Sequence, residues 1–220
     1  MSNGTYLTVG KTAETEIVIL KSRFIGSCFP CTTEQEALTH LQEIRERWKS
    51  ASHYCYAYII GKNMGIMRYS DDGEPGGTAG LPIINTMKAK HIVDCCVVVT
   101  RYFGGILLGT GGLSRAYAQS CGEALEQAGI VAMELTQRYR CVVPYTVWES
   151  VRYHAEKLPV QLRDAEYGSE ISFTLLVRRE DSDSVVRRFR DISRNQMRNT
   201  FVDETYSAWE NAAGLSSSVR

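Results

Sequence analysis

The sequence has no excess of either charge and no long apolar run. Its 25 Lys and Arg residues balance 25 Asp and Glu residues. This balance excludes a protein held to nucleic acid by net charge alone, although local basic patches stay open. No stretch approaches the roughly 18 consecutive apolar residues that span a bilayer, so we expect no membrane partner.

Signals for secretion and disulfide formation are also missing. The start, MSNGTYLTVG, has no basic segment followed by an apolar one, so no secretory signal is expected. The seven cysteines are an odd number and lie mostly in apolar segments, as buried thiols do. Cys28 and Cys31 have a zinc-like spacing, but no second pair accompanies them. We therefore predict a cytoplasmic protein and assign no metal site to the cysteines.

The composition of the chain changes near residues 130–140. Sixteen of the 18 glycines precede this region, whereas after Tyr139 the basic residues are eleven Arg and one Lys. No Pro/Ser-rich linker marks the change, so a short connection is expected. We predict two domains, over residues 1–135 and 139–212, and a flexible tail over residues 213–220.

The first domain is expected to be a mixed α/β unit. Its predicted strands are Glu16–Leu20, Phe24–Phe29, Tyr54–Ile60, Gly65–Tyr69 and Val93–Tyr102, and its predicted helices are Thr33–Ser50, Ala79–His91 and Leu113–Ala128. The apolar Val93–Tyr102 strand is expected at the centre of a sheet covered on both faces. Tyr54, Tyr56 and Tyr58 share one strand face, which packs beneath a helix or, if exposed, stacks bases.

The second domain has the predicted order βαββαβ. Its strands are Tyr139–Val143, Val160–Glu166, Glu170–Arg179 and Thr200–Trp209, and its helices are Tyr145–Lys157 and Asp183–Arg194. This is the ferredoxin-like order. The chain as a whole is therefore expected to belong to the α+β class.

A glycine-rich segment follows the apolar strand and leads into a helix. Its glycines are Gly104, Gly105, Gly109, Gly111 and Gly112. Glycine lets backbone N–H groups approach an anion, and a helix N-terminus adds partial positive charge. Arg101 before the segment and Arg115 after it predict a phosphate-binding loop, with Lys21 and Arg23 as further contacts. The alternative is that the glycines only permit a sharp turn and tight packing, since no P-loop lysine is present.

A cluster of acidic residues precedes the predicted helix Ala79–His91. Asp71, Asp72 and Glu74 lie at a turn, and Thr78 is a candidate helix cap. The carboxylates could hold Mg²⁺ or orient the arginines of the glycine segment, and His53 is the nearest candidate base. A turn of solvated or arginine-paired acids explains the same residues.

The predicted helix Asp183–Arg194 carries a second basic feature. Arg187, Arg190 and Arg194 fall on the side opposite its apolar stripe. Three like charges on one face suggest an acidic partner such as RNA. A solvated face that is partly neutralised by neighbouring aspartates is an equal alternative.

Four segments together resemble the IMPACT/YigZ family. They are KSRF at Lys21–Phe24, HYCYAY at His53–Tyr58, SDDGEPGGTAGLPI at Ser70–Ile83 and VVVTRYFGGILLGTGGLSRAY at Val97–Tyr117. The resemblance implies a first domain like the second domain of a small-subunit ribosomal protein, and a second domain like one of the translocating elongation factor. It also implies a link to translation, because eukaryotic relatives regulate translation under amino-acid starvation through a protein partner. The extra N-terminal domain that binds this partner in those relatives is not expected here.

The expected function is that of a stress-related regulator of translation that binds RNA or the ribosome. An additional regulatory protein partner is compatible with this expectation, and an enzymatic activity is not favoured. Both domains then resemble translation proteins, which is an argument from fold analogy. The alternative is a Mg²⁺-dependent enzyme acting on a phosphorylated small molecule or nucleotide. In that case the glycine segment binds the substrate phosphate, and Asp72 or Glu74 binds the metal or acts as a base.

Overall fold

The computed structural model describes residues 4–209 of the chain. These residues form two compact units, Tyr6–Ala132 and Met133–Trp209, the latter joined by Gly4 and Thr5. We call them the first unit and the second unit. The tail predicted over residues 213–220 lies outside the described residues. None of the helices between residues 4 and 209 combines the length and apolar character needed to cross a membrane.

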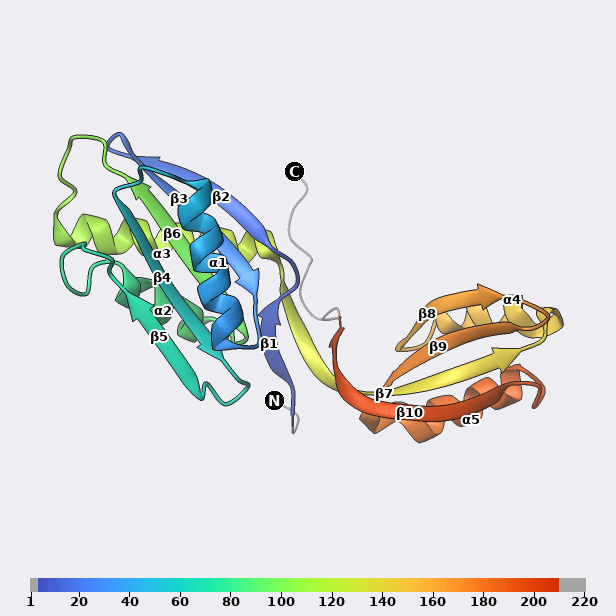
Figure 1. Cartoon of the computed structure of the whole chain (residues 1–220). Coiled ribbons are helices and arrows are strands. Elements are labelled where there is room, and N and C mark those ends of the chain that lie inside the picture. The colour runs from blue at the N-terminus through green and yellow to red at the C-terminus, as the bar shows by residue number, and fades with distance from the viewer. Residues whose placement is uncertain (1–3, 210–220) are drawn as a thin grey trace. The chain divides into compact units, whose positions relative to one another are not determined.

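The first unit is built on a five-stranded antiparallel sheet with helices on both faces (Figure 1). The strands are β2 (Ala13–Ile19), β3 (Ser22–Pro30), β4 (His53–Ile60), β5 (Ile66–Ser70) and β6 (Cys95–Tyr102), in the order β2-β3-β6-β4-β5. The helices are α1 (Glu34–Arg47), α2 (Gly80–Ala89) and α3 (Gly109–Ala128). A further strand, β1 (Tyr6–Val9), pairs with β7 (Ile130–Val143), which runs from the first unit into the second.

The central position of β6 explains its almost continuous apolar sequence. Val97 and Val99 belong to the core beneath α2 and α3, whereas Cys96 and Val98 belong to the core beneath α1. Successive side chains of a strand point to opposite faces, so both faces of β6 must be apolar. The prediction of a central, doubly covered strand is confirmed.

The tyrosine stripe of β4 lies on the α1 face. Tyr58 is buried there, and Tyr54 and Tyr56 pack partly buried against the same core. α1 itself begins with a capping box, in which Thr33 Oγ1 accepts from the backbone N–H of Glu36 and the Glu36 carboxylate accepts from that of Thr33. The covered alternative for the tyrosines is therefore correct.

The second unit has the predicted element order βαββαβ. After β7 come α4 (Tyr145–Ala155), β8 (Val160–Tyr167), β9 (Ile171–Arg178), α5 (Ser182–Ile192) and β10 (Arg198–Trp209), with a short 3₁₀ turn, η1 (Arg179–Asp181), before α5. β9 lies between β7 and β8, and β10 also pairs with β7. Alternate residues of β7 and β9 form one core with α4 and α5.

Two predicted boundaries differ most from the structure. α3 begins at Gly109 rather than Leu113, so three of the five glycines lie in its first turn instead of in a loop. β7 begins at Ile130 rather than Tyr139. Glycine has a low helix propensity, and the first half of β7 mixes charged and apolar residues, so neither boundary has a strong periodic signal.

Candidate functional site

A pocket of about 490 Å³ lies in the first unit, between the end of β6 and the start of α3. Its polar lining residues are Ser52, His53, Glu74, Arg101 and Thr110, its larger apolar ones are Pro75, Phe103, Leu107, Leu108 and Leu113, and Gly73 and Gly109 complete it. An apolar pocket with a few converging polar groups is the usual form of a small-ligand site.

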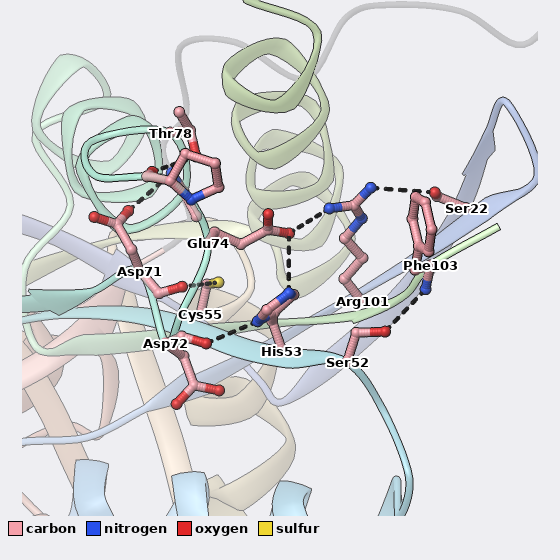
Figure 2. A network of polar contacts seen from close by, with 12 residues as sticks. Ser22, Ser52, His53, Cys55, Asp71, Asp72, Glu74, Thr78, Arg101 and Phe103 are labelled. Atoms are coloured by element: carbon pink, nitrogen blue, oxygen red, sulfur yellow. Dashed lines mark hydrogen bonds and ion pairs between the residues drawn. The ribbon is translucent and has the colours of Figure 1, made fainter. Parts of the chain in front are cut away.

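A buried ion pair lines this pocket. Arg101 Nη1 lies 2.6 Å from Glu74 Oε1, and the two side chains are 6% and 3% exposed (Figure 2). Tyr117 donates its hydroxyl to the same carboxylate oxygen at 2.8 Å. Burial raises the pKa of Tyr117 well above its ordinary value, so this hydroxyl stays protonated and remains a donor. Glu74 thus has two buried donors that hold its carboxylate in one orientation.

Two aromatic rings flank the guanidinium of Arg101. The guanidinium carbon lies 5.3 Å from the centre of the Phe24 ring and 5.4 Å from that of Phe103. Arg101 Nη2 also donates to Ser22 Oγ at 3.4 Å, whereas Nε is buried and has no hydrogen-bond partner among the described residues. A buried donor without a partner is costly, and such groups often mark the place of a ligand or water.

His53 lies beside the ion pair. Its Nδ1 lies 2.8 Å from the backbone carbonyl oxygen of Asp72. Because a carbonyl oxygen only accepts, Nδ1 carries a proton and donates it to this oxygen. Nε2 lies 4.0 Å from Glu74 Oε1, as Figure 2 shows. The antiparallel register of β4 and β6 pairs His53 with Arg101, which brings these distant residues together.

Two serines fix the loop that leaves β6. Ser52 Oγ accepts from the backbone N–H of Phe103, and Ser22 Oγ accepts from that of Gly104, both at 3.1 Å. A Cβ atom at Gly104 would lie 2.1 Å from the carbonyl carbon of Lys21. Only glycine fits at this close approach, so the packing alternative is correct for this one glycine.

The acidic turn caps α2 through Asp71 and not through the predicted residue, Thr78. Thr78 donates its hydroxyl to the backbone oxygen of Pro75 at 2.6 Å and does not cap α2. Asp71 Oδ1 instead accepts from the backbone N–H groups of Ala79 and Gly80, at 3.0 and 2.8 Å. The Asp71 carboxylate is a favourable acceptor at this position because its negative charge complements the positive end of the helix dipole.

The three carboxylates of this turn serve three separate partners. Asp72 pairs with Arg45 at 2.8 Å and accepts from the backbone N–H of Tyr54 at 2.7 Å, whereas Glu74 pairs with Arg101. Only Glu74 therefore orients an arginine of the glycine segment. No group of three acidic, histidine or cysteine residues within the described part of the chain is arranged to hold a metal ion. The acidic turn therefore does not present its three carboxylates as one shared set of metal ligands.

The other basic candidates of the first unit lie outside the pocket lining. Arg115 is exposed on α3, and its Nη1 lies 3.5 Å from the Cβ position of Gly111, one turn earlier. Lys21 is exposed at the turn between β2 and β3, with φ 65°. Arg23 makes a two-pronged ion pair with Glu16 at 2.8 and 2.9 Å. The structure thus brings Arg101, Glu74 and His53 together, but not Arg115 or Arg23.

The basic residues of α5 belong to the second unit. Arg187, Arg190 and Arg194 are exposed, and none of them has an ion-pair partner among residues 4–209. α5 ends at Ile192, and Arg194 has φ 53°, so the predicted helix end was wrong and Arg194 does not extend the helical stripe.

Several residues of the site were not identified from the sequence. Ser22, Ser52, Phe103 and Tyr117 all contact the Arg101 network or its loop. Of these four residues, only Tyr117 has a sequence feature that points to the site, because a tyrosine buried within an apolar helix stripe needs a partner for its hydroxyl. The serines have none, since their roles depend on the sheet register.

Comparisons with known proteins agree with the two-unit structure. Residues 20–125 match the model of the Impact N-terminal domain, and residues 141–196 match that of a domain of unknown function, DUF1949. A crystal structure described as that of a hypothetical protein has a TM-score of 0.58 and 25% identity, and the match covers 90% of this chain and 98% of that one.

Relatives in bacteria and animals carry one family name. IMPACT family member YvyE of Bacillus subtilis is 39% identical over 82% of this chain and 83% of its own length. YigZ of Escherichia coli is 36% identical over 62% of this chain and 64% of its own length. Protein IMPACT of Bos taurus is 33% identical, over only 40% of this chain and 29% of its own length. The chain belongs to the IMPACT family.

Proposed function

We propose that this protein is a cytoplasmic regulator of translation that binds RNA or the ribosome through a phosphate group at the start of α3. The observation that carries the proposal is the unprotected N-terminus of this helix. α3 has no side-chain cap and no acidic residue in its first turn. The first backbone N–H groups of a helix have no partner within it and carry partial positive charge, so they favour an anion.

Glycines allow a phosphate to come close to these N–H groups. Gly109 has φ 69°, in the left-handed region, and Gly111 follows it in the first turn. The exposed Arg115 lies along this turn and supplies a guanidinium within reach of a bound phosphate. Lys21 adds an exposed ammonium near the loop. We assign no direct phosphate contact to Arg101, because it is buried and its charge is matched by Glu74.

The second unit supports the same proposal through α5. Its exposed arginines without ion pairs can contact further phosphates. They are better placed to do so than paired arginines, because a paired arginine must first separate from its carboxylate. The order βαββαβ supports a ferredoxin-like assignment for the second unit. The analogy of the first unit to a ribosomal protein domain rests on family resemblance. The Mg²⁺-dependent enzyme has less support, because the acidic turn lacks a ligand set.

The proposal is tested by binding of single-stranded RNA and of ribosomes at increasing salt. Affinity should fall with salt, and Arg115→Gln and Lys21→Gln should each weaken binding and reduce the slope of log K against log salt by about 0.7–0.9. Lys88→Gln, at the far end of α2, is the matched control for loss of one exposed charge. Absence of binding at low salt, or equal effects of all three substitutions, would contradict the proposal.

A further inference from the structure

The pocket beside α3 offers more than a phosphate site. Beside the helix start at Gly109 and Thr110 it has an apolar lining, and polar groups with free hydrogen-bonding capacity. A bare phosphate uses neither of these features. The volume of about 490 Å³ is also larger than one phosphate needs and falls in the range of small-molecule sites.

We infer that this pocket binds a nucleoside monophosphate unit, with the phosphate on the N-terminus of α3 and the nucleoside between the apolar lining and the His53–Glu74–Arg101 cluster. This inference rests on the proposed function in sharing its phosphate position. It goes further by assigning the base and sugar to a defined cavity.

The apolar lining suits a flat base. The Phe103 ring is 48% exposed although it belongs to the pocket, so one part of its surface is open to a ligand. Stacking of a base on an exposed aromatic ring is a common and sequence-tolerant mode of nucleotide binding. Leu107 is 84% exposed in the same loop, which leaves a second apolar side chain available to cover the base.

The polar cluster suits the hydroxyl and amino groups of a nucleoside. His53 Nδ1 donates to the backbone oxygen of Asp72, and Nε2, 4.0 Å from Glu74 Oε1, lies where it can exchange a hydrogen bond with a ligand hydroxyl group. Arg101 is 5% exposed, and its Nε is a buried donor without a hydrogen-bond partner among the described residues, a state that often marks a place for a water or ligand oxygen. Arg101 and the first residues of α3, Gly109 and Thr110, line one cavity, and the buried Arg101 is an observation independent of the helix N-terminus.

The most informative variant is Thr110→Glu, with Thr110→Gln as its matched control. Thr110 is exposed in the first turn of α3, where a carboxylate stabilises the helix while repelling a bound anion. A urea midpoint of Thr110→Glu equal to or above that of Thr110→Gln separates loss of binding from loss of folding. Phe103→Leu tests the stacking contact, because it keeps an apolar side chain without the ring.

Calorimetric titrations should use four nucleoside monophosphates, the corresponding nucleosides and inorganic phosphate. We expect saturable binding of a monophosphate, at least about tenfold tighter than inorganic phosphate or the nucleoside, and a loss of about tenfold or more in Thr110→Glu but not in Thr110→Gln. Binding of no monophosphate, binding no tighter than that of inorganic phosphate, or equal binding by Thr110→Glu would overturn the inference.

Two further arms identify the source of the monophosphate and separate this inference from the proposed function. A 5′-phosphorylated oligoribonucleotide that binds tighter than the free monophosphate assigns the site to an RNA end, and equal affinity assigns it to a free nucleotide. Binding of RNA without any binding of monophosphates refutes the pocket inference alone. Binding of monophosphates without any binding of RNA or ribosomes supports the pocket and refutes the proposed function.

Discussion

The two units differ in how deeply their most buried ion pair lies: Arg101–Glu74 in the first unit is 6% and 3% exposed, and Arg178–Glu134 in the second is 20% and 20% exposed. In the first unit, Arg101 at the end of β6 pairs with Glu74 of the acidic turn, and both side chains are buried. In the second unit, ion pairs such as Arg140–Glu166, 66% and 73% exposed, lie at the surface. A buried pair is held in one geometry and is costly to break, whereas an exposed pair contributes little and exchanges readily for another partner. Fixed geometry suits a shaped pocket, and exposed arginines suit long-range attraction of an anionic partner.

The largest expected effect is that of removing one partner of the buried pair. Glu74→Ala leaves the Arg101 charge buried without a carboxylate, so the free energy of unfolding should fall by about 3–5 kcal/mol. The exposed counterpart, Glu166→Ala, should lower it by no more than about 1 kcal/mol. Equilibrium urea unfolding measures both. If the two variants lost similar stability, the contrast between the units would be wrong.

The next effect concerns the close approach of the loop to the turn between β2 and β3. Gly104→Ala places a Cβ within 2.1 Å of the Lys21 carbonyl carbon, and overpacking of this kind costs about 1–3 kcal/mol. Gly122→Ala, in the interior of α3 with no atom within 4 Å of the new Cβ, should instead stabilise by about 0.4–1 kcal/mol. Thermal unfolding distinguishes the signs, and destabilisation by both would show that helix glycines are also constrained.

A further difference between the units is the distribution of buried thiols, which titrate at alkaline pH. Six of the seven thiols lie in the first unit, and burial raises the pKa of Cys31, and of Cys141 in the second unit, from 9.0 to about 12. A raised folded-state pKa means that the stabilisation is complete below about pH 9 and is lost as the pH rises toward 12. The urea concentration at the unfolding midpoint should therefore be constant up to about pH 8 and decrease above pH 9.

The control for the alkaline effect is Cys31→Ala. It removes one titrating thiol, so its decline above pH 9 should be shallower than that of the unsubstituted chain. A decline of identical steepness would mean that groups other than the buried thiols cause the alkaline loss of stability.

The smallest effect on stability is expected at the exposed arginines of α5 and of the turn that follows it. Replacing Arg187, Arg190 and Arg194 by Gln should change the free energy of unfolding by no more than about 0.5 kcal/mol. It should nevertheless reduce the salt slope of RNA binding by up to about 2–3, because each phosphate contact contributes about 0.7–0.9. The matched triple variant replaces the paired arginines Arg140, Arg152 and Arg198. Equal changes of the salt slope in the two triple variants would show that RNA binding does not depend on whether an arginine is free of ion pairs.

The same contrast explains what the sequence alone could predict. The helices and strands follow from apolar periodicity, and this local signal gave the central β6 and the order βαββαβ. The ion pair joins residues 27 positions apart, and its partner His53 is brought in by the pairing of β4 with β6. Such a cluster depends on sheet register, which no local pattern specifies.

The acidic turn shows that the partners of single side chains could not be predicted from the sequence. Asp71, Asp72 and Glu74 are almost adjacent in the sequence, which suggested a joint role. Asp72 has φ 43° and Gly73 has φ 88°, so the backbone turns sharply between the carboxylates. They therefore reach a helix start, an exposed arginine and a buried arginine, respectively. Backbone conformations of this kind are not encoded in a simple residue pattern.

The most direct test of the central claim is the binding of single-stranded RNA to Thr110→Glu at low salt, measured by fluorescence anisotropy beside Thr110→Gln. A phosphate at the start of α3 predicts that Thr110→Glu binds at least about tenfold more weakly, with a urea midpoint equal to or above that of the control. Equal affinity of the two variants for RNA, with both folded, would contradict a phosphate site at this helix.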